Sequence, residues 1–248
     1  MKFLSFLLLF IPTVSLAQTD SGKSLEFNDR KFTLGWFYSP ELAYRFLSEG
    51  DNADASTSSI IKSRNENELP RFGQSTSLFL GYRLNQRLSV EAGFISTDYG
   101  EAQKPTDLVY AGDPENPIGT VNQSNHLSVL SIPINLRYNW GGFLKTTVFS
   151  SLGVSPGMFH TYRSVQKIDY NNGDQATSVF YSVSAQDKYA TFIVSAQISS
   201  GLDIKYNRKG SLRIAPVFRM TTTSVTKDTP IRGHYFNAGI EFGTTYKL

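Results

Sequence analysis

Apolar and polar side chains alternate along most of this chain from Lys31 onward, with a period of two residues. Because successive side chains of a β-strand point to opposite faces, this period predicts strands with one apolar and one polar face. We find no helical periodicity of useful length. The apolar positions form eight runs, within residues 32–46, 78–84, 88–94, 130–140, 148–154, 192–204, 212–220 and 236–248. The eight runs predict an all-β fold, an eight-stranded antiparallel up-and-down transmembrane β-barrel. Single-chain bacterial barrels have an even number of strands, as here.

The connections between these runs alternate in length. Three are short and rich in Asn and Gly, at residues 85–86, 139–142 and 206–210, as tight hairpin turns require. Four are long and polar, at residues 47–70, 99–125, 161–188 and 222–233. Short turns at one end and long loops at the other are typical of outer-membrane barrels, with both termini on the periplasmic side. Within the third long loop, residues 171–174 separate two β-prone stretches and predict a hairpin that extends beyond the membrane.

The first residues have the pattern of a secretory signal peptide. Lys2 supplies a positive charge, residues 3–11 are apolar, and Ser15-Leu16-Ala17 form a small-x-small cleavage site before Gln18. We therefore expect a signal peptide over residues 1–17, a short periplasmic segment over 18–30 and an outer-membrane barrel over 31–248. No later apolar run reaches the roughly 20 residues of a spanning helix, which excludes a helical membrane protein.

Side-chain volume and charge predict which face of the strands meets lipid. The apolar face carries bulky residues such as Trp36 and Trp140, which would not fit inside eight strands, because such an interior is only just wide enough for side chains. The opposite face is rich in Gly, Ser, Thr and Ala. Although 18% of the residues in the chain are charged, none of the apolar-face positions of the eight runs is Asp, Glu, Lys or Arg. A charge facing the bilayer midplane costs about 2–4 kcal/mol for Arg or Lys, so the apolar face is the one expected to contact lipid.

The charged residues of the strands fall instead in the frame that faces the lumen. Buried charges persist only when they are paired and hydrogen-bonded, so we predict a structural network of salt bridges there. Its predicted members are Glu41, Arg45, Arg83, Glu91, Arg137, Arg213, Arg219 and Glu241, and Lys145 and Asp203 share the same frame. The three glutamates could in principle perform acid–base chemistry, but the surrounding arginines favour the structural interpretation.

Composition excludes several other classes of function. The chain has no cysteine, so disulfides, thiol nucleophiles and Cys-based zinc sites are absent, and its net charge of +3 does not suggest a nucleic-acid partner. The histidines, His126, His160 and His234, all lie at the loop-side ends of strands. His126 and His234 share the apolar-face frame and should point toward lipid headgroups. We therefore expect no catalytic residue, no metal site and no cofactor.

Several motifs resemble a known class of barrel. The segment Ser131-Ile132-Pro133-Ile134-Asn135-Leu136-Arg137-Tyr138 looks like a strand of PorT-like and OmpA-like outer-membrane barrels, and the hairpin over residues 81–93 is similar to their second hairpin. Gly153-Val154-Ser155-Pro156-Gly157 and Ser39-Pro40-Glu41 resemble two further strands. The C-terminus resembles the signal read by the barrel-assembly machinery, with Gly243, Tyr246 and Leu248 in the places of Gly, aromatic and hydrophobic residues. Leu248 departs from the terminal Phe that is commonest there.

These observations favour a non-enzymatic barrel of the Gram-negative outer membrane, whose extracellular loops have a structural or binding role. The resemblance also permits a component or assembly factor of an envelope secretion or transport complex. A small pore is disfavoured because eight strands leave a filled lumen, and a rim-located lipid-modifying enzyme lacks a convincing set of residues. The expected partners are outer-membrane lipid, the barrel-assembly machinery during insertion and an envelope protein, but no nucleic acid.

Overall fold

The computed structural model of the protein describes residues 31–182 and 189–248. The predicted signal peptide and periplasmic segment, residues 1–30, lie outside the described residues. Among the helices within the described ranges, none is long and apolar enough to cross a membrane.

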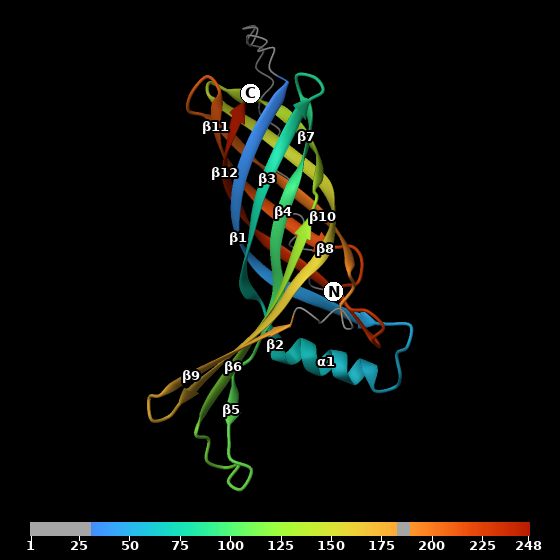
Figure 1. The fold of residues 1–248 in the computed structure, drawn as a ribbon, viewed down its shortest axis with the longest axis vertical. Coiled ribbons are helices and arrows are strands. Elements are labelled where there is room, and N and C mark those ends of the chain that lie inside the picture. Colours follow the sequence, from blue (N-terminus) through green and yellow to red (C-terminus); the bar gives the residue numbers. More distant parts are fainter. Residues whose placement is uncertain (1–30, 183–188) are drawn as a thin grey trace.

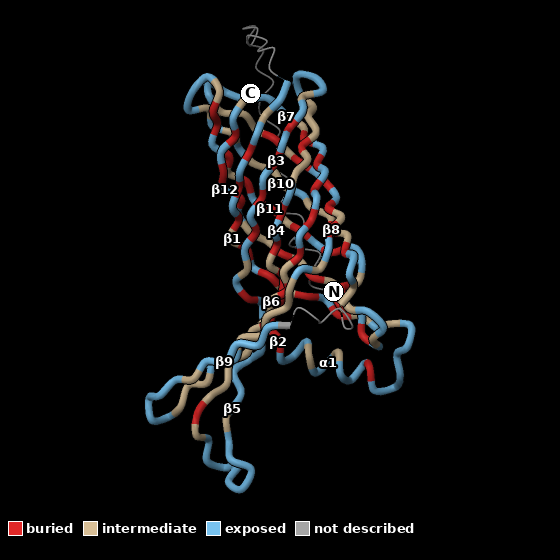
Figure 2. The backbone as a smooth tube through the Cα atoms, viewed as in Figure 1, coloured by how far each residue is buried: buried red, intermediate tan, exposed pale blue. Residues whose placement is uncertain are grey.

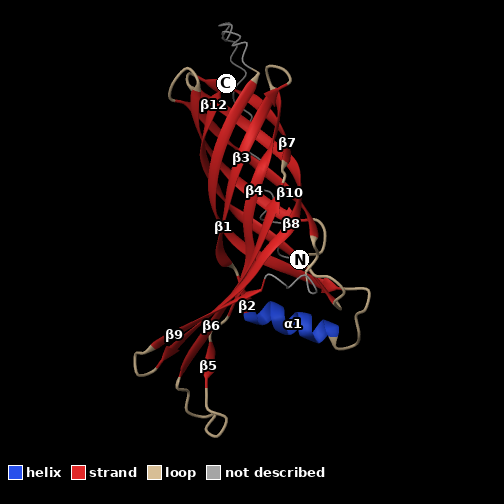
Figure 3. Cartoon of the chain, viewed as in Figure 1, coloured by secondary structure: helices blue, strands red, loops and turns tan. Residues whose placement is uncertain are grey.

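The strands close into an eight-stranded antiparallel up-and-down barrel, which confirms the predicted fold (Figures 1 and 3). β12 pairs with β1 and so closes the ring. β6 and β7 together make one barrel strand, interrupted at Ile132 and Pro133, because both halves pair with β4 and with β8. The strands of the ring are β1 (Phe32–Glu49), β3 (Arg71–Arg83), β4 (Leu88–Gln103), β6 (Gly119–Ser131) with β7 (Ile134–Phe143), β8 (Thr146–Tyr170), β10 (Phe192–Lys205), β11 (Gly210–Thr221) and β12 (Ile231–Lys247).

The pairing register fixes how far the strands tilt. A path of directly paired residues leaves β1 at Leu34 and returns to β1 at Tyr44, ten residues further along. The path runs Leu34, Leu80, Ala92, Ile134, Val154, Ala196, Met220, Phe236, Tyr44. A stagger of ten residues over eight strands corresponds to a tilt of about 40° from the barrel axis. Such a barrel is narrow, and its interior has room for side chains but not for a wide channel.

Buried and more exposed residues alternate along most of β1, β3, β11 and β12 (Figure 2). The outward positions of the barrel carry mostly apolar side chains. The outward Trp36 is 53% exposed, whereas its neighbour Phe37 is 1% exposed and lies in the lumen. The prediction of a lumen lined by small and polar residues is therefore incomplete, because Phe37, Phe79 and Phe149 are also inside. Glycine makes space for them: a Cβ added at Gly243 would lie 2.2 Å from the Phe37 ring.

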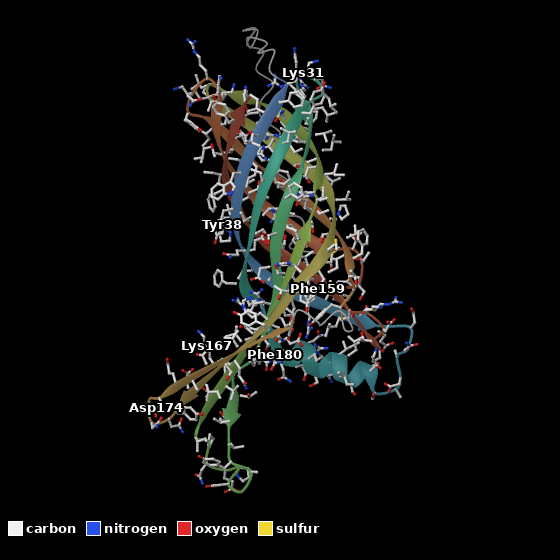
Figure 4. The ribbon with its side chains drawn as sticks, viewed as in Figure 1. Lys31, Tyr38, Phe159, Lys167, Asp174 and Phe180 are labelled. Carbon is white, nitrogen blue, oxygen red and sulfur yellow. The ribbon has the colours of Figure 1, made fainter. Side chains whose placement is uncertain are left out.

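Two barrel strands, β6 and β8, continue beyond the barrel and pair there with β5 (Thr106–Leu108) and β9 (Gln175–Ser182); we call this four-stranded extension of the sheet the wing. Its order is β5, the first part of β6, the last part of β8, and β9. β8 and β9 form the hairpin predicted around residues 171–174, which is confirmed. A bulge at His160 separates the wing from the barrel, since Val129 pairs with Phe159 but Ser128 pairs with Thr161. Lys167, Asp174 and Phe180 project from the β8–β9 hairpin (Figure 4).

The loop between β1 and β3 contains a helix, α1 (Thr57–Asn67), and a short strand, β2 (Glu68–Leu69), which pairs with the end of β4. The hydrophobic periodicity gives no sign of this helix. α1 buries only Thr57 among its residues, so it has no apolar stripe that a periodicity search could detect.

Asp54 holds the start of α1 through its carboxylate. The Oδ1 atom accepts hydrogen bonds from the backbone N–H groups of Ser56 and Thr57, both at 3.0 Å, and from their hydroxyls at 2.7 and 2.9 Å. The bonds from the Ser56 and Thr57 hydroxyls, aided by those backbone groups, lower the pKa of Asp54. Because the folded pKa lies below the unfolded one, this contribution is present above the unfolded pKa. It is lost as the pH falls through the folded pKa.

We therefore expect α1 to loosen in acid, at a pH below about 4. Amide hydrogen exchange of residues 57–67 should accelerate between pH 5 and 2, after correction for the intrinsic pH dependence of exchange. Asp54→Ala should show fast exchange already at neutral pH, whereas the wing variant Asp107→Ala should behave as the parent protein. Equal exchange in Asp54→Ala and the parent protein at neutral pH would contradict this role.

Candidate functional site

The first cluster of charges in the lumen lies toward the short-turn end of the barrel. Two carboxylates, Glu91 and Asp203, lie between two guanidinium groups, Arg137 and Arg213. Arg213 donates to Glu91 at 2.8 and 3.1 Å and to Asp203 at 3.1 Å. Arg137 donates to Asp203 at 2.6 Å and to Glu91 at 3.3 Å. Both guanidinium groups also lie over the ring of Phe149, at 4.0 and 4.7 Å from its centre, so the charges are balanced and the space around them is filled.

The second cluster occupies the middle of the lumen around Arg219. This side chain donates to Glu41 and, at 3.3 Å, to Glu241. The other oxygen of Glu41 accepts hydrogen bonds from Ser75 at 2.8 Å and from Asn237 at 2.6 Å. Two carboxylates therefore share one guanidinium group, and each depends on it for charge compensation.

The third cluster closes the end of the lumen nearest the wing. Arg45 donates to Glu68 through two nitrogens and lies 3.3 Å from Glu101. Tyr235 donates to the second oxygen of Glu101 at 3.1 Å. Arg64 of α1 reaches the same Glu68 at 3.0 Å. The helix loop is thus joined to the barrel by ion pairs that the strand frames alone did not include.

Of the predicted lumen residues, seven take part in the three clusters: Glu41, Arg45, Glu91, Arg137, Arg213, Arg219 and Glu241. Arg83 is the last residue of β3 and is partly buried. Lys145 is not in the lumen, because β7 and β8 turn at residues 144 and 145 and leave its side chain exposed. That these ion pairs stabilise the barrel stays a prediction.

Apolar side chains fill the lumen between the middle cluster and the end nearest the wing. They form a buried group of Tyr99, Leu127, Val129, Ile193, Val225 and Tyr235. Phe159 and Tyr189 stack against this group with ring centres 5.4 Å apart, and burial raises the pKa of Tyr189. The gap beside Arg219, between Tyr99 and Ser155, has no room for a water molecule. At this level of the barrel, the described side chains are packed without a water-sized space between them.

A second site lies on the outside of the barrel wall, where the wing leaves it. We call it the outer-wall pocket; it has a volume of about 250 Å³. It is lined by Gln74, Thr76, Ser96, Asp98, His126, Ser128, Thr161, Arg163 and Tyr181. These residues come from β3, β4, β6, β8 and β9, so the pocket lies where barrel strands and wing strands meet, next to the His160 bulge.

Asp98 and His126 form the polar centre of the outer-wall pocket. Oδ2 of Asp98 lies 3.1 Å from Nδ1 of His126, and Oδ1 accepts a bond of 2.5 Å from Arg71. A terminal nitrogen of Arg163 lies 3.1 and 3.4 Å from the two ring nitrogens of His126. With the imidazole proton on Nδ1, His126 donates to Asp98 and its Nε2 can accept from one terminal nitrogen of Arg163.

The three histidines have different surroundings. His234 contacts the carbonyl oxygen of Thr221 at 3.3 Å, and His160 is exposed in the bulge. Ser124 lies 3.5 Å from Nε2 of His126, at the limit of a hydrogen bond, and a nitrogen of Arg163 lies 3.4 Å from the same atom. In the described ranges, no group of three or more His, Asp or Glu side chains is placed to hold a metal ion.

The residues of the predicted assembly signal lie at the end of the last strand. Gly243 and Tyr246 belong to β12, and both pair with β1 and with β11. The Tyr246 side chain is on the outside of the barrel, where Lys209 lies over its ring at 5.4 Å. Leu248 follows the strand, and its backbone N–H donates to Phe32 at 3.1 Å. Recognition of this segment by the assembly machinery stays a prediction.

Comparison with known proteins gives no family assignment from sequence. No family model matches the chain, and no curated protein matches it. Among solved structures, Neisserial surface protein A is 11% identical, with a TM-score of 0.43, and the match covers 88% of this chain and 97% of that one. The outer membrane protein OprG from Pseudomonas aeruginosa is 12% identical, with a TM-score of 0.36 and coverage of 88% and 96%. The outer membrane protease OmpT from Escherichia coli is 8% identical, with a TM-score of 0.34 and coverage of 92% and 100%.

Proposed function

We propose that this protein is a non-enzymatic component of the bacterial outer membrane, with a closed barrel that anchors an extracellular wing for binding another envelope protein. One observation carries the proposal: the barrel is apolar outside and filled inside, while the wing extends beyond it. A closed barrel has no transport path, so the exposed wing is the part of the described structure best placed to interact.

The outer surface supports the placement in a membrane. Outward side chains of β1 from Phe32 to Phe46 are apolar apart from the Tyr hydroxyls, and Trp36 and Phe46 are 53% and 63% exposed. A membrane-spanning strand needs about 9–11 residues, which β1 exceeds. In water this belt would expose far more apolar surface than a soluble monomer tolerates. The predicted export signal and the periplasmic position of the termini fit the same proposal.

The wing supports a protein partner. Within the described residues β9 pairs only with β8, so its other edge is open, and Gln175–Ser182 contains no charged residue. Phe180 and Tyr181 are 65% and 64% exposed on opposite faces of the strand. An open edge strand without charged residues can accept a strand from another chain through backbone hydrogen bonds. A subunit of an envelope secretion or transport complex, as in PorT-like barrels, would use such an edge.

The proposal is tested in the native membrane. A photo-crosslinking amino acid at position 180 should yield one stoichiometric adduct with an envelope protein. Val179→Lys should abolish the adduct while the barrel keeps its heat-modifiable migration on gels. Tyr110→Lys is the control: this exposed residue lies two positions after the end of β5, and its substitution should leave the adduct unchanged. Steady, sizeable conductance in planar bilayers, or a protein that stays soluble in the periplasm, would contradict the proposal.

A further inference from the structure

We propose that the outer-wall pocket binds the phosphorylated headgroup of a lipid in the outer leaflet. This inference rests on the proposed membrane placement but not on the wing's protein partner. It is argued from the position of the pocket, its charge and its size.

The pocket interrupts the apolar surface that would face lipid. On β3, the outward Leu78 and Phe72 are 47% and 79% exposed, yet Thr76 and Gln74 between them are polar and line the pocket. On β4, the outward Phe94 is followed by Ser96 and Asp98.

The same change occurs across the next strands. Leu130 of β6 and Met158 of β8 are exposed outward, and beyond them Ser128, His126, Thr161 and Arg163 line the pocket. Polar groups that face hydrocarbon without a partner cost several kcal/mol each. A polar notch at the wing end of an apolar wall is therefore suited to the layer where lipid headgroups meet the acyl chains.

The charges of the pocket favour an anion. Asp98 is compensated by Arg71, which donates to it from the lumen side, and its second oxygen is satisfied by His126. Arg163 then remains as a positive charge without a carboxylate within salt-bridge distance among the described residues. Its contact with His126 involves one terminal nitrogen, so the rest of the guanidinium fork is available. Arginine binds phosphate with two parallel, charge-assisted hydrogen bonds, and the hydroxyls of Ser128 and Thr161 line the same space.

The size of the pocket fits a headgroup and not a whole lipid. Its 250 Å³ is smaller than the roughly 300–1,000 Å³ of sites that enclose drug-sized molecules. Tyr181 of β9 forms the wall on the wing side, while Phe94 and Leu130 continue the apolar surface on the barrel side. A lipid whose phosphate contacts Arg163 would thus have its acyl chains against the outward side chains of β4 and β6.

The test uses the full mature chain refolded in a zwitterionic detergent and then exposed to defined lipids. Native mass spectrometry should show retention of phosphatidylglycerol over a diacylglycerol with the same acyl chains. Arg163→Gln should raise the dissociation constant for phosphatidylglycerol at least about tenfold, because a pair of charge-assisted hydrogen bonds is lost. Arg232→Gln removes an exposed arginine elsewhere at the rim and is the matched control, expected to leave binding unchanged. Heat-modifiable migration shows that each variant is folded.

Several results would overturn the inference. Equal retention of the two lipids, or equal retention by Arg163→Gln and the parent protein, would show that the pocket is not the site. Inorganic phosphate that binds as tightly as the lipid would indicate a soluble anion instead. Release of free fatty acid from the bound lipid, lost in His126→Ala, would indicate hydrolysis and not binding. Insertion into lipid vesicles, measured separately, distinguishes failure of this site from failure of the membrane placement.

Discussion

Replacing Arg219 with methionine is expected to lower the free energy of unfolding by about 3–5 kcal/mol, because it leaves buried carboxylates without a compensating charge. Arg219 is 3% exposed and contacts Glu41 and Glu241, whose side chains are 0% and 8% exposed. Methionine fills much of the same volume, so the loss would report on charge more than on packing. Equilibrium unfolding in urea from lipid vesicles, followed by tryptophan fluorescence, measures the effect.

Arg232→Met provides the control for this change. Arg232 pairs with Asp51 at 2.5 Å, but both side chains are exposed, at 44% and 87%, so its removal should cost about 0–1 kcal/mol. Combining Arg219→Met with Glu41→Gln should recover part of the lost stability, because it removes one of the uncompensated charges. A loss below 1 kcal/mol in Arg219→Met, or no recovery in the double variant, would mean that the middle cluster does not stabilise the barrel as we describe.

The barrel could be predicted from sequence because its two faces differ at every second residue. The alternation of inward and outward positions along each strand was enough to predict Glu91, Arg213 and Arg219 in the lumen, where the structure has them. This alternation could not predict the two other carboxylates of the third cluster. Glu68 belongs to β2, directly after α1, and Glu101 lies in residues 99–125, which the sequence pattern assigns to a polar loop. Ion-pair partners that come from a loop depend on how that loop folds back onto the barrel. The two-residue period of a strand contains no information about this.

The outer-wall pocket shows the same limit more clearly. Asp98, His126 and Arg163 lie 28 and 37 residues apart along the chain, and only the pairing of β4, β6 and β8 brings them together. The bulge at His160 also shifts the parity of β8, so that Arg163 faces outward although a strict alternation from Phe149 would place it inward. A single extra residue in one strand thus decides whether this arginine lies in the lumen or at the lipid-facing wall.

The lumen also contains large side chains that the sequence pattern does not predict. Phe37 is inside the barrel, although the many small residues of the inward face predict a narrow, polar interior. The glycines and the ring are complementary: Gly35 and Gly243 flank Phe37, and Arg213 lies over its ring at 4.6 Å. Sequence shows which residues are small, but only the register shows which large side chain they accommodate.

Because of this complementarity, Gly243→Val is expected to be severely damaging to the barrel itself. A Cβ at this position would lie 2.2 Å from the backbone oxygen of Trp36 and 2.2 Å from Cδ1 of Phe37, so β1 and β12 would have to separate where the barrel closes. We expect the variant to lose the heat-modifiable band almost completely, both in cells and after refolding into detergent. Gly112→Val is the matched control, because a Cβ there meets no atom within 4 Å and should be tolerated.

Refolding without cellular factors separates two roles of Gly243. If it acts mainly as part of the signal for the assembly machinery, purified Gly243→Val should refold normally in detergent and fail only in cells. If it makes space for Phe37, the purified variant should also fail, and a second change, Phe37→Ala, should restore part of the folding by removing the ring that clashes. The oxygen of Trp36 cannot be removed in this way, so the recovery should be partial. Tyr246→Ala should show the opposite behaviour, because its exposed ring contributes little inside the barrel: slow assembly in cells, but normal refolding in detergent.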